Sequence, residues 1–108
     1  MGNFKRLQAR LMLEANQAVW KERQRQNELY GHQRRPWGQW LAILGEEVGE
    51  VNQAIQPLLG IETTKPTDAD DFGKELIHVA AVALAMYEQL IEEKEQSHIK
   101  APYMDLDD

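Results

Sequence analysis

The chain has 108 residues, of which 43% are hydrophobic and 28% charged, and it contains no cysteine. This length fits one compact domain, and the hydrophobic fraction argues against intrinsic disorder. The lack of thiols excludes disulfide frameworks, cysteine-ligated metal sites and cysteine nucleophiles. The first ten residues lack the layout of a signal peptide, and no apolar stretch approaches the roughly 20 residues that span a bilayer. We therefore expect a cytoplasmic protein with no membrane partner.

The net charge of −6 is unevenly distributed along the chain. Residues 1–36 contain eight lysines and arginines against three acids, whereas residues 37–108 contain four against fifteen. A phosphate backbone would repel the larger, acidic part, so nucleic acid is not the expected partner. The two parts are expected either to fold onto each other or to bind a metal–polyphosphate complex.

Helical spacing dominates the sequence and alternating strand patterns are absent, which predicts an all-α fold. The first helix is expected over about residues 3–30, and its polar second half, Lys21 to Glu28, is expected on the surface. Gly31 ends this helix, and a loop then leads to a second helix that begins at Pro36. The apolar stripe of the first helix consists of Phe4, Leu7, Leu11, Ala15 and Ala18.

The second helix has an apolar stripe that is expected to form its core-facing side. Pro57 and Gly60 end the helix. Trp37 lies on the stripe and is expected in the core, whereas Trp40 lies off its centre. The stripe consists of Trp37, Leu41, Leu44, Val48, Val51 and Ile55.

The third helix is expected to begin at a cap at Thr67 or Asp68, with further aspartates up to Asp71 in its first turn. It contains the most apolar stretch of the sequence, residues 76–87. Nearly every face of this stretch is apolar, so it needs burial on more than one side. We therefore expect one domain of about three main helices, completed by dimer or tetramer formation, with residues 97–108 as an acidic tail.

Two clusters of acidic residues remain after the core residues have been assigned. In the first, Glu47 is expected at the edge of the core, Glu50 one turn along the same flank, and Glu46 nearly opposite. Repulsion between Glu47 and Glu50 is unfavourable unless a cation lies between them, and Gly49 leaves space beside them. Glutamates on a helix more often form a solvated face, so this cluster alone does not define a site.

The second cluster, Asp71, Glu75 and His78, forms one ridge of the third helix. If the second and third helices pack antiparallel, Glu47 and Glu50 face Glu75 and His78. Oxygen-rich sites of this kind bind Mg²⁺ or Mn²⁺, which also bind substrate phosphates. The alternative is that His78 is a hydrogen-bonded core residue, which is the more common role of a single histidine on an apolar helix.

Together, the EEVGE motif at residues 46–50 and the ELIH motif at residues 75–78 resemble the signature of the MazG-like all-α nucleoside triphosphate pyrophosphohydrolases. That signature is EExxE, a gap and ExxD, and the resemblance covers about half the chain. It implies a helical dimer or tetramer that uses Mg²⁺ to split a (deoxy)nucleoside triphosphate into the monophosphate and pyrophosphate. It also implies that Glu47, Glu50 and Glu75 are metal ligands and that Glu46 is the base for the attacking water.

The chain departs from the family pattern at His78, which occupies the position of the family aspartate. Imidazole can bind a divalent metal but suits Mn²⁺ better than Mg²⁺. Two alternatives therefore stay open, namely a catalytically weakened relative that binds nucleotide or metal, and a helical interaction protein that uses its basic first helix. For the enzyme, the candidate phosphate-binding residues are Lys21, Arg34, Arg35 and Lys74, and Trp40 is the candidate for stacking on the base.

Overall fold

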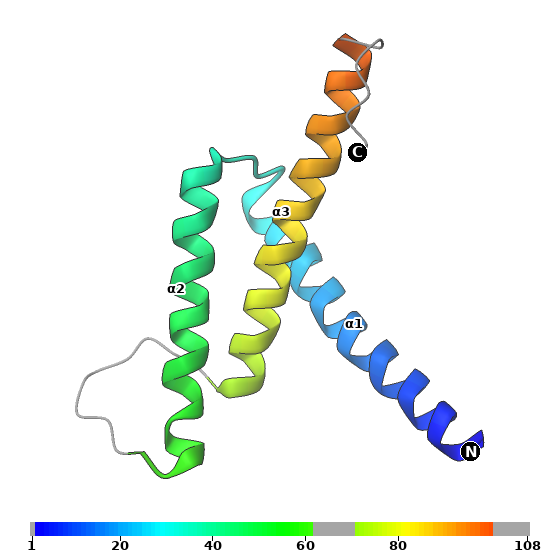
Figure 1. Cartoon of the computed structure of the whole chain (residues 1–108), viewed down its shortest axis with the longest axis vertical. Helices are drawn as coiled ribbons and strands as arrows, with labels where there is room; N and C mark the ends of the chain where they lie inside the picture. Colours follow the sequence, from blue (N-terminus) through cyan, green and yellow to red (C-terminus); the bar gives the residue numbers. More distant parts are fainter. Residues whose placement is uncertain (1, 62–70, 101–108) are drawn as a thin grey trace.

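The computed structural model describes residues 2–61 and 71–100, which contain three α-helices and one short 3-10 helix. In chain order these are α1 (Gly2–Tyr30), α2 (Trp37–Ile55), η1 (Pro57–Leu59) and α3 (Phe72–Lys100). The described residues include no strand, so the predicted all-α fold is confirmed. In Figure 1, α2 and α3 lie side by side and antiparallel, and α1 crosses α3 with its N-terminal half projecting away from the pair.

The predicted breaks between helices lie where the sequence places them. Gly31 has a φ of +74° and its N–H donates to the carbonyl oxygen of Asn27 at 2.9 Å, which ends α1. Gly60 has a φ of +76° and closes η1. Pro36 is the N-cap of α2, with a ψ of 144°, so the helix begins one residue later than predicted.

The start of α3 differs from the prediction. Asp71 precedes the helix, and its Oδ1 accepts a hydrogen bond of 2.8 Å from the backbone N–H of Lys74. Asp71 is therefore an N-cap residue and not a member of the first turn. The predicted caps Thr67 and Asp68 lie outside the described residues. At its other end α3 continues to Lys100, beyond the predicted start of the tail, and residues 101–108 also lie outside the description.

The prediction that the polar second half of α1 lies on the surface is wrong for Arg23. The apolar first half is exposed, including Phe4, Leu7 and Leu11, whereas Arg23 in the polar second half is buried. The Arg23 guanidinium donates two hydrogen bonds to Glu88 of α3, at 3.0 and 2.8 Å. The reason is geometric, because α1 crosses α3 only with its second half, where a charged partner offsets the desolvation of arginine.

The buried side of α2 is rotated from the predicted stripe and overlaps it at Leu44, which packs against the core. Trp40 is only 3% exposed and packs with Val82 and Ala85 of α3, whereas Trp37 on the stripe is 42% exposed. Leu41 and Val48 of the stripe are also exposed. The buried side is centred on Trp40 and its neighbours one and two turns along, about 90° round the helix from the stripe.

The loop between α1 and α2 is attached to the C-terminal half of α3 by polar contacts. Arg34 and His32 both interact with Glu92, and the backbone of Arg35 is hydrogen-bonded to Gln89. Together with the pair of Arg23 and Glu88, these contacts show that the basic part of the chain folds onto the acidic part. Within residues 2–61 and 71–100, no helix has both the length and the apolar character to cross a membrane.

Candidate functional site

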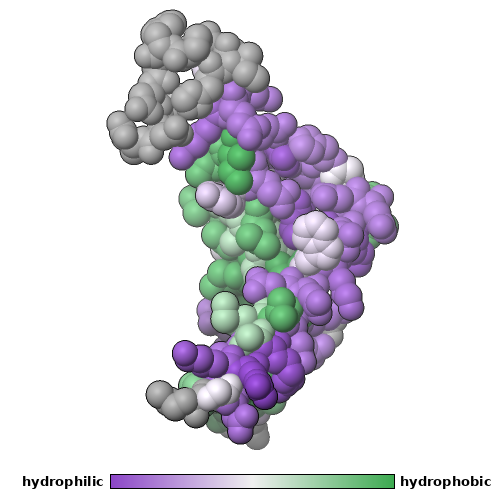
Figure 2. Space-filling model, turned by 90° about the vertical axis from the view of Figure 1, so that its right-hand side faces the viewer, coloured by the Kyte–Doolittle hydropathy of each residue, from purple (hydrophilic) through white to green (hydrophobic). Residues whose placement is uncertain are grey.

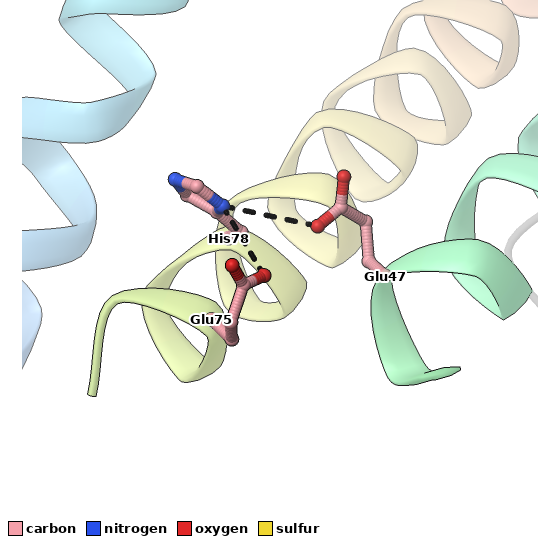
Figure 3. A group of neighbouring side chains, drawn as sticks. All are labelled: Glu47, Glu75 and His78. Carbon is pink, nitrogen blue, oxygen red and sulfur yellow. Dashed lines mark ion pairs between the residues drawn. The ribbon is translucent and has the colours of Figure 1, made fainter. Parts of the chain in front are cut away.

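Three ionisable side chains meet between α2 and α3, near the start of α3 (Figure 3). Glu47 comes from α2, and Glu75 and His78 come from successive turns of α3. The Nδ1 atom of His78 lies 3.6 Å from Oε2 of Glu75 and 3.9 Å from Oε2 of Glu47. One ligand atom from each residue lies within 4.8 Å of the other two. The predicted convergence is therefore present for Glu47, Glu75 and His78, whereas Glu46, Glu50 and Asp71 are not members of this group.

The helical phase explains why these residues converge. Glu47 lies seven residues, or about two turns, after Trp40, so it shares the buried side of α2. Glu75 lies seven residues before Val82, which places it on the side of α3 that packs against α2, and it is only 2% exposed. His78 is one turn further on and half-buried. The chain thus places a carboxylate on each helix at a position where an apolar residue is usual.

These residues fit a divalent cation in spacing and in donor chemistry. Ligands of an ion at about 2.1 Å lie about 3.0 Å apart when adjacent and about 4.2 Å apart when opposite. The distances of 3.6 and 3.9 Å fall between these values. Oε2 of Glu47 is buried and has no hydrogen-bond partner among the described residues. Buried carboxylates that face each other without a cation are unfavourable, so the cluster is a candidate metal centre.

Glu50 borders the cluster and has a strongly shifted pKa. Loss of hydration, a hydrogen bond with Glu75 and the charges of Glu47, Glu75 and Glu46 raise the pKa of Glu50 from 4.5 to about 7. Near neutral pH, a large fraction of the Glu50 carboxyl is therefore protonated in the absence of a cation. The predicted base Glu46 lies on the exposed side of α2.

A pocket of about 240 Å³ adjoins the cluster and is lined by all three helices and by the loop between α1 and α2. Glu47 and His78 form one part of its wall, and Arg35 and Trp40 form another. The guanidinium of Arg35 lies 5.6 Å from the centroid of the Trp40 ring, and its Nε atom is buried with no hydrogen-bond partner in the described part of the chain. The pocket therefore contains an acidic region and a cationic region.

The predicted substrate-binding residues are distributed between this pocket and other places. Arg35 and Trp40 line it, although Trp40 is buried and carries the Arg35 guanidinium above its ring. Arg34 lies outside the pocket lining and pairs with Glu92. Lys21 and Lys74 are exposed and do not belong to the lining either.

Sequence reasoning missed the contribution of α1 to this pocket. Glu22, Arg25, Gln26 and Tyr30 all line it. Arg25 donates hydrogen bonds of 2.9 and 2.8 Å to Glu22, and these hold the pKa of the Glu22 carboxyl below its ordinary value. The available signal was the dense polar run at residues 21–28, which we assigned to a solvated surface.

No family model, curated protein sequence or solved structure matches this chain.

Proposed function

We propose that the protein hydrolyses a nucleoside triphosphate or deoxynucleoside triphosphate to the monophosphate and pyrophosphate with the help of Mg²⁺ or Mn²⁺. The observation that carries this proposal is the cluster of Glu47, Glu75 and His78 beside a pocket that also contains Arg35. A metal–triphosphate complex needs both oxygen-rich metal ligands and cations for the phosphates, and the two lie along one pocket. The resemblance of the EExxE and ELIH motifs to the MazG-like enzymes supports the same chemistry.

Each residue of the site has a role in the proposed phosphoryl-type transfer that follows from its charge and position. Glu47, Glu75 and Nδ1 of His78 would hold the cation, with Glu50 as a further carboxylate at the edge of the cluster. When bound, the cation neutralises the charge of the triphosphate and lowers the pKa of water. Arg35 has a buried Nε donor available for a phosphate oxygen. Pyrophosphate would leave after water attacks the α-phosphorus; the family resemblance alone implies Glu46 as the acceptor of the water proton, since Glu46 lies on the exposed side of α2 and outside the pocket lining.

The size of the pocket limits how much of the substrate it can enclose. Its volume of about 240 Å³ is below the range of about 300–1,000 Å³ that encloses drug-sized ligands. We therefore propose that the pocket takes the phosphates, and that the nucleoside extends along the rim formed by α1 and the loop. The prediction of a cytoplasmic protein that acts as a dimer or tetramer belongs to the same proposal.

The decisive experiment measures pyrophosphate release from the canonical and common modified nucleoside triphosphates, with saturating Mg²⁺ and Mn²⁺ in parallel. We expect equal amounts of monophosphate and pyrophosphate from at least one nucleotide. Glu47→Gln should lower kcat by about 100-fold or more, because the neutral amide is a poor metal ligand of nearly the same shape. The matched control is Glu28→Gln, which changes an exposed glutamate of α1 and should leave the rate unchanged.

The second candidate function is binding without turnover, which the replacement of the family aspartate by His78 favours. In that case a nucleotide with Mn²⁺ would raise the melting temperature of the wild type, but not of Glu47→Gln, and no product would form. Absence of both product and stabilisation across the whole nucleotide panel would contradict both candidate functions.

A further inference from the structure

Arg35 differs from the other arginines near the pocket because its charge has no anionic partner in the described chain. Each of the three arginines that precede it between residues 23 and 34 is paired with a carboxylate, namely Arg23, Arg25 and Arg34. Within residues 2–61 and 71–100, no ion pair and no hydrogen bond reaches the guanidinium of Arg35, and its Nε atom is buried. A cation removed from water without a counter-ion is unfavourable, so Arg35 has a charge that an anionic ligand would balance.

The position of Arg35 also separates it from the cations of the surface. On the side from which α1 projects, hydrophilic side chains form a broad area beside a band of hydrophobic ones (Figure 2). The exposed Arg10 of α1 needs no further ligand, because water solvates its charge and Glu14 pairs with it. Arg35 is instead half-buried and lines the pocket of about 240 Å³ between the helices. An anion that enters the pocket therefore meets an arginine whose charge is unpaired.

Trp40 and Gln89 hold Arg35 in one position. The guanidinium lies 5.6 Å from the centroid of the Trp40 ring, which is within the range of a cation–π contact. The Gln89 side chain accepts a 3.0 Å hydrogen bond from the backbone N–H of Arg35 and donates one of 2.8 Å to its carbonyl oxygen. The same Gln89 oxygen accepts a 2.7 Å hydrogen bond from Nε1 of Trp40. The backbone and the side chain of Arg35 are therefore both placed before a ligand binds, which lowers the entropic cost of binding.

We infer that Arg35 binds a phosphate or diphosphate group without the help of a metal ion, and that Trp40 positions the Arg35 guanidinium instead of stacking on a base. The planar guanidinium matches the oxygens of phosphate in a bidentate geometry. Trp40 is only 3% exposed and carries the guanidinium above its ring, so its faces are not open to a base. The choice of phosphate as the anion rests on the proposed function, whereas the unpaired charge of Arg35 does not.

The site at Arg35 lies apart from the candidate metal centre. Trp40, which carries the guanidinium, precedes Glu47 by seven residues on α2, and this corresponds to about 10 Å along the helix axis. Glu22 also lines the pocket, but Arg25 neutralises it through hydrogen bonds of 2.9 and 2.8 Å. We therefore expect that neither carboxylate prevents an anion from binding at Arg35 when no cation is bound.

The test is a calorimetric titration of the full chain with inorganic pyrophosphate in the presence of EDTA and at constant ionic strength. We expect saturable binding at pyrophosphate concentrations below about 10 mM. Arg35→Gln should weaken this binding at least about tenfold, because it removes the charged donors. The matched control Arg10→Gln removes the same charge from an exposed position of α1 and should change the affinity less than about twofold.

The fluorescence of Trp40 gives a second readout that does not depend on a substitution in the core. The chain has three tryptophans, and the combined changes Trp20→Phe and Trp37→Phe replace the two exposed ones. In this background, pyrophosphate should change the emission of Trp40 with the dissociation constant found by calorimetry, because the group that binds it lies over the ring. Adding Arg35→Gln should abolish the response, while far-UV circular dichroism should keep its helical spectrum.

Two substitutions of Trp40 test its positioning role. Trp40→Phe keeps an aromatic ring beneath the guanidinium and should retain the pyrophosphate affinity within about threefold. Trp40→Leu removes the ring and should weaken binding about tenfold. Equal affinities of these two variants, with both shown to be helical by circular dichroism, would contradict the positioning role.

Three further outcomes would overturn the inference. The first is the absence of saturable pyrophosphate binding to the wild type in EDTA, and the second is an unchanged emission of Trp40 at saturating pyrophosphate. The third is loss of binding in Arg25→Gln but not in Arg35→Gln, which would place the anion at the other arginine of the pocket. Failure of the proposed function looks different, because nucleotides would then give no pyrophosphate with Mg²⁺ or Mn²⁺ while the metal-free binding at Arg35 stays intact.

Discussion

Two clusters of polar side chains lie between α2 and α3, and they differ in how their polar groups are satisfied. At the cluster near the C-terminal half of α3, Gln89 is 3% exposed and accepts a 2.7 Å hydrogen bond from Nε1 of Trp40. The Gln89 amide oxygen also accepts from the backbone N–H of Arg35, and its nitrogen donates to the backbone carbonyl of Arg35 and to the Glu93 carboxylate. At the cluster near the start of α3, Glu47 and Glu75 face each other and His78, and Oε2 of Glu47 accepts no hydrogen bond from the described residues.

The cluster around Gln89 stabilises the fold, whereas the cluster around Glu47 and Glu75 brings like charges together. A buried polar network with all its hydrogen bonds made fixes the register of the helices that it joins. Buried like charges lower stability unless a cation or a proton joins them. Gln89 therefore belongs to the scaffold, whereas the glutamates are retained at the expense of stability, which is typical of a functional site.

We expect substitution in the cluster around Gln89, which we call the scaffold cluster, to destabilise the fold strongly. Gln89→Ala removes the acceptor for Trp40 and both hydrogen bonds to the backbone of Arg35, leaving buried polar groups unsatisfied. We expect the free energy of unfolding in urea to fall by about 3 kcal/mol. The control Gln39→Ala truncates an exposed glutamine of α2 and should change it by less than about 0.5 kcal/mol. Equal effects of the two substitutions would remove the distinction between the clusters.

The sequence predicted the helices and the contents of the glutamate cluster, because both depend on local signals. Gly31, Pro36 and Gly60 mark breaks in the chain whatever the tertiary structure is. The spacing of Glu75 and His78 on one ridge, with Glu47 on the facing helix, was enough to predict their convergence once antiparallel packing was assumed.

The direction that each helix faces could not be predicted, because it depends on partners far away in the sequence. Trp40 is buried because Gln89, 49 residues later, accepts its N–H. Arg23 is buried because Glu88 is its partner across 65 residues. The apolar stripe that includes Leu41 has the correct period, but the inner side of α2 contains Glu47, which a hydropathy pattern assigns to the surface. Periodicity therefore found the most apolar side of α2, of which Trp37, Leu41 and Val48 are exposed.

Substitutions of His78 should change which metal ion the glutamate cluster binds. His78→Asp replaces the imidazole by a carboxylate, which should raise Mg²⁺ affinity about tenfold and reduce the preference for Mn²⁺. His78→Ala should weaken Mn²⁺ binding about tenfold or more, as measured by calorimetry. His32→Asp serves as the control, since His32 lies on the loop beside Glu92. If metal affinity is the same in both His78 variants and in the wild type, His78 is a core residue and not a ligand.

A pH dependence distinguishes the two clusters without removing either one. The pKa of Glu50 is about 7 in the folded protein and 4.5 ordinarily, so the folded state binds more protons between these values. The stabilising contribution of protonated Glu50 is therefore complete below pH 4.5 and is lost as the pH rises through 7. We expect the melting temperature of the metal-free protein to fall from about pH 5 to 8, and Glu50→Gln to flatten this slope.

The ion pair of Arg23 and Glu88 changes stability with pH in the opposite direction and in a lower pH range. Arg23 lowers the pKa of Glu88, so the stabilising contribution of this pair is present above pH 4.5 and is lost as the pH falls through the lowered value. Glu88→Gln should therefore leave the slope between pH 5 and 8 unchanged. Saturating Mn²⁺ should reduce the same slope as Glu50→Gln does, because a cation and a proton compete for the carboxylates. If neither Glu50→Gln nor Mn²⁺ changes the slope of the melting temperature between pH 5 and 8, repulsion within the glutamate cluster does not destabilise the fold.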